Sequence, residues 1–127
     1  MSQYKIFLIG AEDEEFGILS ASERDDTYHI EFAYRGRSIT AEASDYFEAL
    51  CQIRLELEKE RLLPFCYGAS LNVYPSEMAR QMGGALKAYR LQRGKHARTQ
   101  DLVDIFAEGP DVTPCFVSLQ REFLKSG

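Results

Sequence analysis

The chain lacks any apolar run approaching the roughly 20 residues that a membrane-spanning helix needs. Its first ten residues contain only a short apolar stretch without a small-residue cleavage site, which predicts a strand and not a signal peptide. Cysteine is scarce: Cys51, Cys66 and Cys115 are odd in number and widely spaced, unlike a disulfide framework or a zinc site of paired cysteines. We therefore expect a cytoplasmic protein with reduced thiols, no metal, no cofactor and no membrane partner.

Short catalytic signatures are absent as well. The patterns G-x-x-x-x-G-K-[ST], G-x-S-x-G and H-E-x-x-H do not occur, and no G-x-G-x-x-G follows a strand. A thiol enzyme needs a low-pKa cysteine beside a histidine and an orienting acid. Cys66, His96 and Asp101 have the right residue types for such a site, but sequence spacing alone cannot place them together. These absences predict that the protein is not an enzyme and has no catalytic residues.

The composition that is present is that of an ordinary globular protein. Of the 127 residues, 45% are hydrophobic and 28% are charged, which suits one domain spanning 1–127 with a single core. Residues 27–34 alternate apolar and polar side chains, the period of a half-buried antiparallel strand. A β-meander is therefore predicted from 4–9, 16–21, 27–34 and 37–43, with Arg24-Asp25-Asp26 and Arg35-Gly36 as tight connections.

Helical periodicity takes over after residue 44. Asp45 and Glu48 form a capping pair, and an apolar stripe follows at helical spacing, which predicts a helix of about 18 residues that Pro64 stops. The later elements are shorter: strands at 65–67, 85–91 and 102–107, a helix capped by Ser76 and ended by Gly83-Gly84, and a helix at 116–124. The predicted fold class is α+β, with a mixed, mainly antiparallel sheet of about six strands covered by one long and two short helices.

Charge is divided unevenly along the chain. Residues 1–60 hold 14 acidic and 6 basic side chains, whereas residues 61–127 hold 6 acidic and 9 basic. Such asymmetry suggests a charged partner, although charge runs are more often solvated surface. An isoelectric point of about 5.1 argues against nucleic acid as that partner, because nucleic-acid-binding domains are usually basic.

The segment from Cys66 to Tyr89 combines two turn signals, a double glycine and two tyrosines. Its distinctive residues are Gly68, Val73-Tyr74-Pro75-Ser76, Met82-Gly83-Gly84 and Lys87-Ala88-Tyr89, followed later by Asp104-Ile105-Phe106. In this combination the chain resembles small bacterial immunity proteins of contact-dependent or polymorphic toxin systems. The resemblance implies a cytoplasmic, non-enzymatic protein that binds one toxin domain and blocks its active site. It carries over no functional residues, because each immunity protein fits its own toxin.

Two candidate surfaces for such a partner follow from charge and residue type. Many secreted toxin domains act on nucleic acids through cationic clefts, so a carboxylate cluster would imitate phosphates and steer association. The first candidate surface is acidic: Glu12, Asp13, Glu14, Glu15, Asp25 and Asp26. The alternative surface is rich in tyrosine and arginine, which anchor many interfaces: Tyr74, Arg80, Lys87, Tyr89, Arg90 and Arg93.

Two other functions stay open at this point. The chain is alternatively a small housekeeping domain that binds a ligand, or a nucleic-acid-binding domain that uses the basic segment Arg80 to Arg98. An immunity protein should be encoded beside a toxin gene, whereas a nucleic-acid-binding domain should be retained on heparin or DNA. The sequence specifies no oligomeric state.

Overall fold

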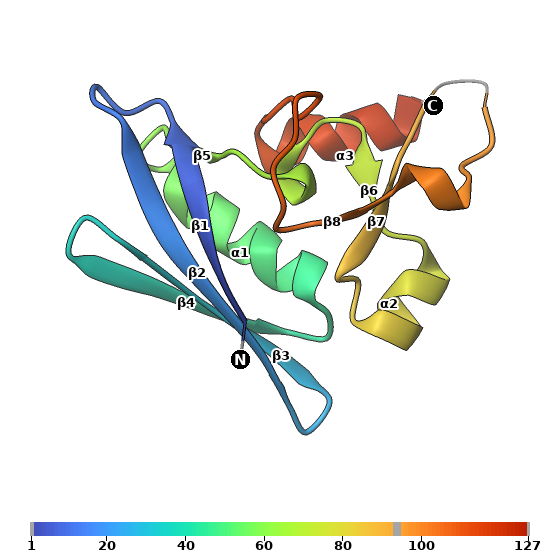
Figure 1. The fold of residues 1–127 in the computed structure, drawn as a ribbon, viewed down its shortest axis with the longest axis horizontal. Helices are drawn as coiled ribbons and strands as arrows, with labels where there is room; N and C mark the ends of the chain where they lie inside the picture. The colour runs from blue at the N-terminus through green and yellow to red at the C-terminus, as the bar shows by residue number, and fades with distance from the viewer. Residues whose placement is uncertain (1, 93–94, 127) are drawn as a thin grey trace.

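The fold is built around two antiparallel sheets (Figure 1). The computed structural model of the chain describes residues 2–92 and 95–126. The larger sheet has the strand order β4-β3-β2-β1-β5. Its strands are β1 (Ser2–Ile9), β2 (Glu15–Arg24), β3 (Thr27–Tyr34), β4 (Arg37–Ala43) and β5 (Leu63–Pro64).

Strands β1 to β4 form the predicted meander. Ile30, Phe32 and Tyr34 of β3 are buried, and the residues between them are exposed, as the alternation in the sequence requires. The turn between β2 and β3 has φ angles of 52° and 62° at Asp25 and Asp26. Two positive φ angles give the turn a twist that matches the flanking strands, so this connection sets the pairing of β2 with β3.

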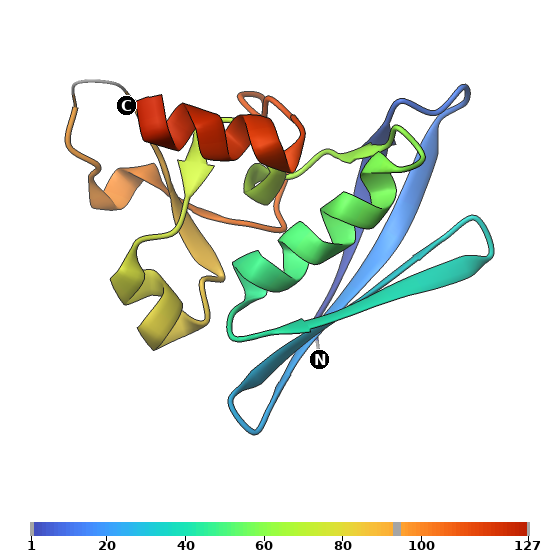
Figure 2. The same cartoon turned by 180° about the vertical axis from the view of Figure 1, so that it is seen from behind.

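Helix α1 (Tyr46–Glu58) follows β4 and covers the inner face of the larger sheet (Figure 2). The predicted cap is confirmed, because the Asp45 side chain accepts a hydrogen bond of 2.8 Å from the Glu48 N–H. The helix is shorter than predicted. Arg61 takes a left-handed φ of 60°, and the Leu62 N–H donates to the Leu57 carbonyl, a closure that ends the helix before Pro64 can do so.

The second half of the chain forms the smaller sheet and, within the described residues, four short helical segments around it. The sheet has the order β6-β7-β8. The elements are the 3₁₀ helix η1 (Tyr67–Ala69), β6 (Val73–Tyr74), α2 (Glu77–Gly83), β7 (Lys87–Arg90), the 3₁₀ helix η2 (Thr99–Asp101), β8 (Leu102–Asp104) and α3 (Val117–Ser126). Buried side chains from both halves of the chain join in one hydrophobic core.

The predicted α+β class, with antiparallel pairing, one long helix and two short ones, is confirmed. The strands divide into a five-stranded and a three-stranded sheet, where the sequence predicted one sheet of about six. The strand predicted at 65–67 is wrong. The N–H groups of Tyr67 and Gly68 donate to the carbonyls of Ala107 and Ile105, and the chain turns into η1 there.

Candidate protein-interaction surfaces

The acidic tip, defined as Glu12, Asp13 and Glu14, lies in the loop between β1 and β2. All three side chains are exposed. Within residues 2–92 and 95–126, no ion pair or side-chain hydrogen bond engages these carboxylates. Because the loop closes a hairpin of two long strands, the acidic tip presents concentrated negative charge on a well-supported end of the sheet.

Glu15, the next residue, belongs to the fold itself. It is half-buried, and its carboxylate lies 2.6 Å from Nε of Arg35 in the β3–β4 turn. Arg35 and Arg37 also pair with Glu60, whose carboxylate accepts a hydrogen bond of 2.8 Å from the Tyr34 hydroxyl. The Glu15 carboxylate is therefore compensated by Arg35 within the fold, and it is less available to a partner than the acidic tip.

Asp25 and Asp26 are exposed but lie far from the acidic tip. The tip precedes β2 and the two aspartates follow it, so the ten residues of that strand separate them. At about 3.3 Å per residue the separation is on the order of 30 Å. The acidic surface predicted as one cluster is thus two separate patches, because a strand is straight and its ends point to opposite edges of the molecule (Figure 1).

The alternative basic surface is also only partly available. Tyr74 and Tyr89 lie opposite each other on β6 and β7. Arg80, on α2, lies 2.7 Å from the Asp45 carboxylate and 3.3 Å from that of Glu48. Its guanidinium also stacks over Tyr74, at 5.2 Å from the ring centroid. Arg80 therefore links α2 to the start of α1 through these ion pairs. Its charge is compensated within the chain and is not available to a partner.

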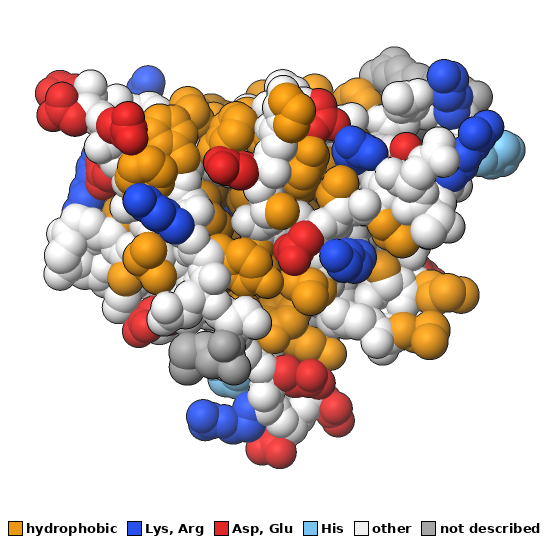
Figure 3. All heavy atoms as spheres, viewed as in Figure 1, with side chains coloured by type: hydrophobic (Ala, Val, Ile, Leu, Met, Phe, Trp, Pro, Cys, Tyr) orange, Lys and Arg blue, Asp and Glu red, His pale blue; other side chains and the backbone are white. Residues whose placement is uncertain are grey.

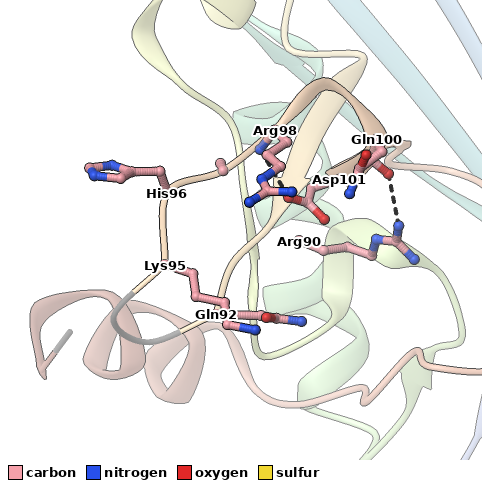
Figure 4. A pocket seen from close by; sticks show the side chains of 8 residues that line it. Arg90, Gln92, Lys95, His96, Arg98, Gln100 and Asp101 are labelled. Carbon is pink, nitrogen blue, oxygen red and sulfur yellow. Dashed lines mark hydrogen bonds between the residues drawn. The ribbon is translucent and has the colours of Figure 1, made fainter.

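Arg90 is similarly engaged, as Figure 4 shows. Its guanidinium donates a hydrogen bond of 2.9 Å to the Gln100 carbonyl, drawn as a dashed line. The same guanidinium lies 3.2 Å from the Asp111 carboxylate, which the figure does not include. It lines a cavity of about 510 Å³ together with Lys95, Arg98 and other polar residues, while His96 points away from its neighbours. Lys87 is exposed on β7, and Arg93 lies outside the described residues.

Two apolar surfaces were missed from the sequence. The first, called here the outer strip, is formed by Phe7, Ile9, Phe16 and Ile18 on the face of the larger sheet that α1 does not cover. A signal for it was present, because residues 6–9 are apolar without interruption and do not alternate with polar residues.

The second surface, called here the methionine groove, lies beside α2. Met78 and Met82 are 68% and 81% exposed and face a hollow of about 320 Å³ that Tyr89 and Leu102 also line. Helix α2 has no buried residue, so these two side chains contribute little to the core. A sequence signal was present, because Met78 and Met82 are four residues apart on a short capped helix and therefore lie on the same face of it.

The thiols do not form a reactive site. Cys66 is fully buried, and this burial raises the pKa of its thiol to about 11. Burial raises the pKa of Cys51 and Cys115 as well. The described residues contain no group of three or more side chains able to hold a metal ion. Nor is any helix of this part of the chain long and apolar enough to cross a membrane.

Comparison with known proteins adds no family to these observations. No protein-family model matches the chain, and a search of curated proteins finds no match.

Proposed function

We propose that this chain is a cytoplasmic immunity protein that binds a cognate bacterial toxin domain and blocks it, with a nuclease as the toxin that the charge suits best. The observation that carries the proposal is the acidic tip: three adjacent carboxylates, exposed and without compensating cations in the described structure. Carboxylates in this arrangement can occupy a cleft that normally holds phosphates.

Electrostatic steering gives this proposal a kinetic signature. Attraction between the acidic tip and a cationic cleft accelerates association, and salt screens it, since the Debye length is only about 8 Å at physiological ionic strength. The surrounding fold supports this use of the loop. The β1–β2 ladder pairs residues as far as Leu8 and Glu15, so both ends of the loop that carries the acidic tip are fixed on the sheet.

The test uses the C-terminal domain of any secreted toxin whose gene adjoins the gene for this chain. Co-expression should protect cells from that domain, and purified proteins should form a complex. Replacing the tip with Glu12→Gln, Asp13→Asn and Glu14→Gln should lower the association rate about tenfold or more at low salt and flatten its salt dependence. Absence of a complex with the unaltered chain would contradict the proposed function.

A matched control is available at the other end of β2. The double variant Asp25→Asn and Asp26→Asn removes two exposed carboxylates, and asparagine tolerates the positive φ angles of that turn. Its association rate should stay close to that of the unaltered chain. An equal loss in both variants would point to net charge and not to the acidic tip.

A second candidate function is nucleic-acid binding, favoured by the cavity that Arg90, Lys95 and Arg98 line. Its case is weakened by the pairing of Arg80 and Arg90 with carboxylates. Retention on heparin and a steep salt dependence of DNA binding would support it, because phosphate contacts release counterions. Lys95→Gln with Arg98→Gln should then abolish that retention.

A further inference from the structure

We propose that the outer strip is the anchoring site of the interface, and that it receives an apolar side chain of the toxin domain from a surface otherwise rich in Lys and Arg. This inference rests on the proposed function and specifies the partner surface that the chain recognises. It follows from the cross-strand register, from the exposure of the strip and from its continuity with the acidic tip.

The register of β1 and β2 builds the outer strip. Phe7 lies opposite Phe16, and their rings meet edge to face with centroids 5.4 Å apart. Ile18 lies opposite Lys5 and, on its other side, opposite Ala33 of β3. The small Ala33 side chain leaves Ile18 open, and Ile18 is 41% exposed. The result is a ridge of large apolar groups on the outer face of the larger sheet.

The inner face of the same strands shows why these residues are not needed for the core. Leu8 and Leu19, which point toward α1, are buried, whereas Phe16 and Ile18 alternate with inward residues and remain exposed. Hydrophobic side chains gather next to acidic ones over the β1–β2 hairpin, at the upper left of Figure 3. Clustered exposed aromatic and branched side chains are typical of interfaces and of aggregation sites.

The charged residues around the outer strip indicate which kind of partner surface it binds. Ile9, at the end of the strip, is followed by Gly10 and the acidic tip, so one side of the apolar surface is rimmed by carboxylates. At the other side, the Lys5 ammonium lies 4.2 Å from the centroid of the Phe16 ring. An apolar centre with a charged rim is the usual arrangement of an interface hot spot. A cationic partner that inserts one apolar side chain complements both parts, with its positive groups toward the acidic tip.

The methionine groove is the strongest competing surface. Its two methionines are more exposed than the outer strip, but the one charged side chain among the described residues that line it is a cation, Lys87 on β7. The described residues that line it include no carboxylate that would select a cationic toxin. We therefore assign the anchor to the outer strip and use the groove as the control.

The experiment measures association and dissociation rates with the toxin domain that the test of the proposed function identifies as the partner. The anchor variant is Phe16→Thr with Ile18→Thr, which keeps residues that favour strands. Its control is Met78→Gln with Met82→Gln, which removes two exposed apolar side chains elsewhere. The anchor variant should dissociate about 10- to 100-fold faster with a nearly unchanged association rate, whereas the acidic-tip variant changes association. The control variant should behave as the unaltered chain.

The possible outcomes are separable. Unchanged dissociation in the anchor variant, or faster dissociation in the methionine variant alone, overturns the anchor while the proposed function stands. If the unaltered chain forms no complex, both proposals fail. If the unaltered chain is a dimer that the anchor variant converts to a monomer, the outer strip is a contact between two copies of this chain, which also overturns the inference.

A second measurement covers the case in which the anchor variant does not fold. Photo-crosslinking uses p-benzoylphenylalanine in place of Phe16, an aromatic replacement at an exposed position. Crosslinking to the toxin domain from position 16, and not from position 82, supports the anchor. The reverse pattern overturns it.

Discussion

Arg54 on α1 and Gln120 on α3 are hydrogen-bonded to each other at 2.7 Å, and both are 1% exposed. Arg54 also donates to the carbonyls of Gly68 and Cys115, at 3.1 and 2.9 Å. Gln120 donates to the carbonyl of Ser70 at 2.8 Å, among others. This buried polar pair supplies donors to the irregular segment between β5 and β6, whose carbonyl groups would otherwise lack partners in the core.

Removing the guanidinium should therefore destabilise the fold. Arg54→Met is expected to lower the free energy of unfolding by about 3 kcal/mol, because three acceptors, two of them in buried hydrogen bonds, lose a donor. Urea unfolding followed by circular dichroism measures this. The control is Arg121→Met, at an exposed position of α3, which should change stability by no more than about 0.5 kcal/mol. Equal midpoints for both variants would contradict the role of the buried network.

The two glycines at the end of α2 should respond differently to alanine. Gly84 has a φ of +62°, and a Cβ there would lie 2.2 Å from the Tyr28 ring, whereas a Cβ at Gly83 meets nothing within 4 Å. Gly84→Ala should cost about 1–3 kcal/mol from crowding, besides its backbone strain. Gly83→Ala should be neutral or slightly stabilising, since it lies within a helix. Thermal unfolding of both variants checks the difference, and a destabilisation shared equally would disprove it.

The thiols should react slowly in the native protein. With the pKa of Cys66 raised to about 11, only about 0.1% of that thiol is ionised at about pH 8, and burial blocks access to it. Alkylation by iodoacetamide, read by peptide mass spectrometry, should modify the half-buried Cys115 first and Cys51 and Cys66 only after unfolding. All three should react readily in denaturant. Rapid native labelling of Cys66 would contradict its burial.

Asp111 should show a low pKa in the folded protein. The Tyr67 hydroxyl donates to its carboxylate at 2.5 Å, and this bond, with Arg90 nearby, holds the pKa of Asp111 below its ordinary value of 3.8. The contribution to stability is present above about pH 3.8 and is lost as the pH falls through the lower folded-state pKa. It is small because the side chain is half exposed.

The variant Tyr67→Phe tests this linkage. The pKa of Asp111, followed by carboxyl-carbon NMR, should rise toward 3.8 in the variant. The stability difference from the unaltered chain should shrink as the pH falls below that value. An Asp111 pKa that is the same in both proteins would show that the hydrogen bond has no effect on the carboxylate.

Local signals in the sequence predicted the first half of the fold well. The strands at 27–34 and 37–43 have the predicted bounds, because alternation and turn residues with positive φ act over a few positions. The caps Asp45 and Ser76 were found for the same reason, since a side chain that accepts from an amide three residues later is encoded locally.

The second half depends on contacts between distant residues. Tyr67 and Gly68 take their helical turn because their amides meet the carbonyls of Ala107 and Ile105, about 40 residues away in the sequence. The predicted acidic surface is divided for a similar reason, because closeness in sequence is not closeness in space. Asp25 and Asp26 are only about ten residues from Glu15 in the sequence, but they lie at the other end of an extended strand. Counting charges along the chain could not show that the Arg80 charge is compensated, because its partners, Asp45 and Glu48, lie more than 30 residues earlier in the sequence.

The alternation of β2 has a consequence for how binding specificity can change. Gly17, Leu19 and Ala21 point inward and are buried, and a side chain at Gly17 would collide with the Phe32 ring. Phe16 and Ile18 point outward and touch little of the core. The inward residues of β2 therefore determine core packing, and the outward residues, which alternate with them, determine the surface. In the proposed interface, mutations at outward positions would change which partner is bound, while the inward positions keep the same fold.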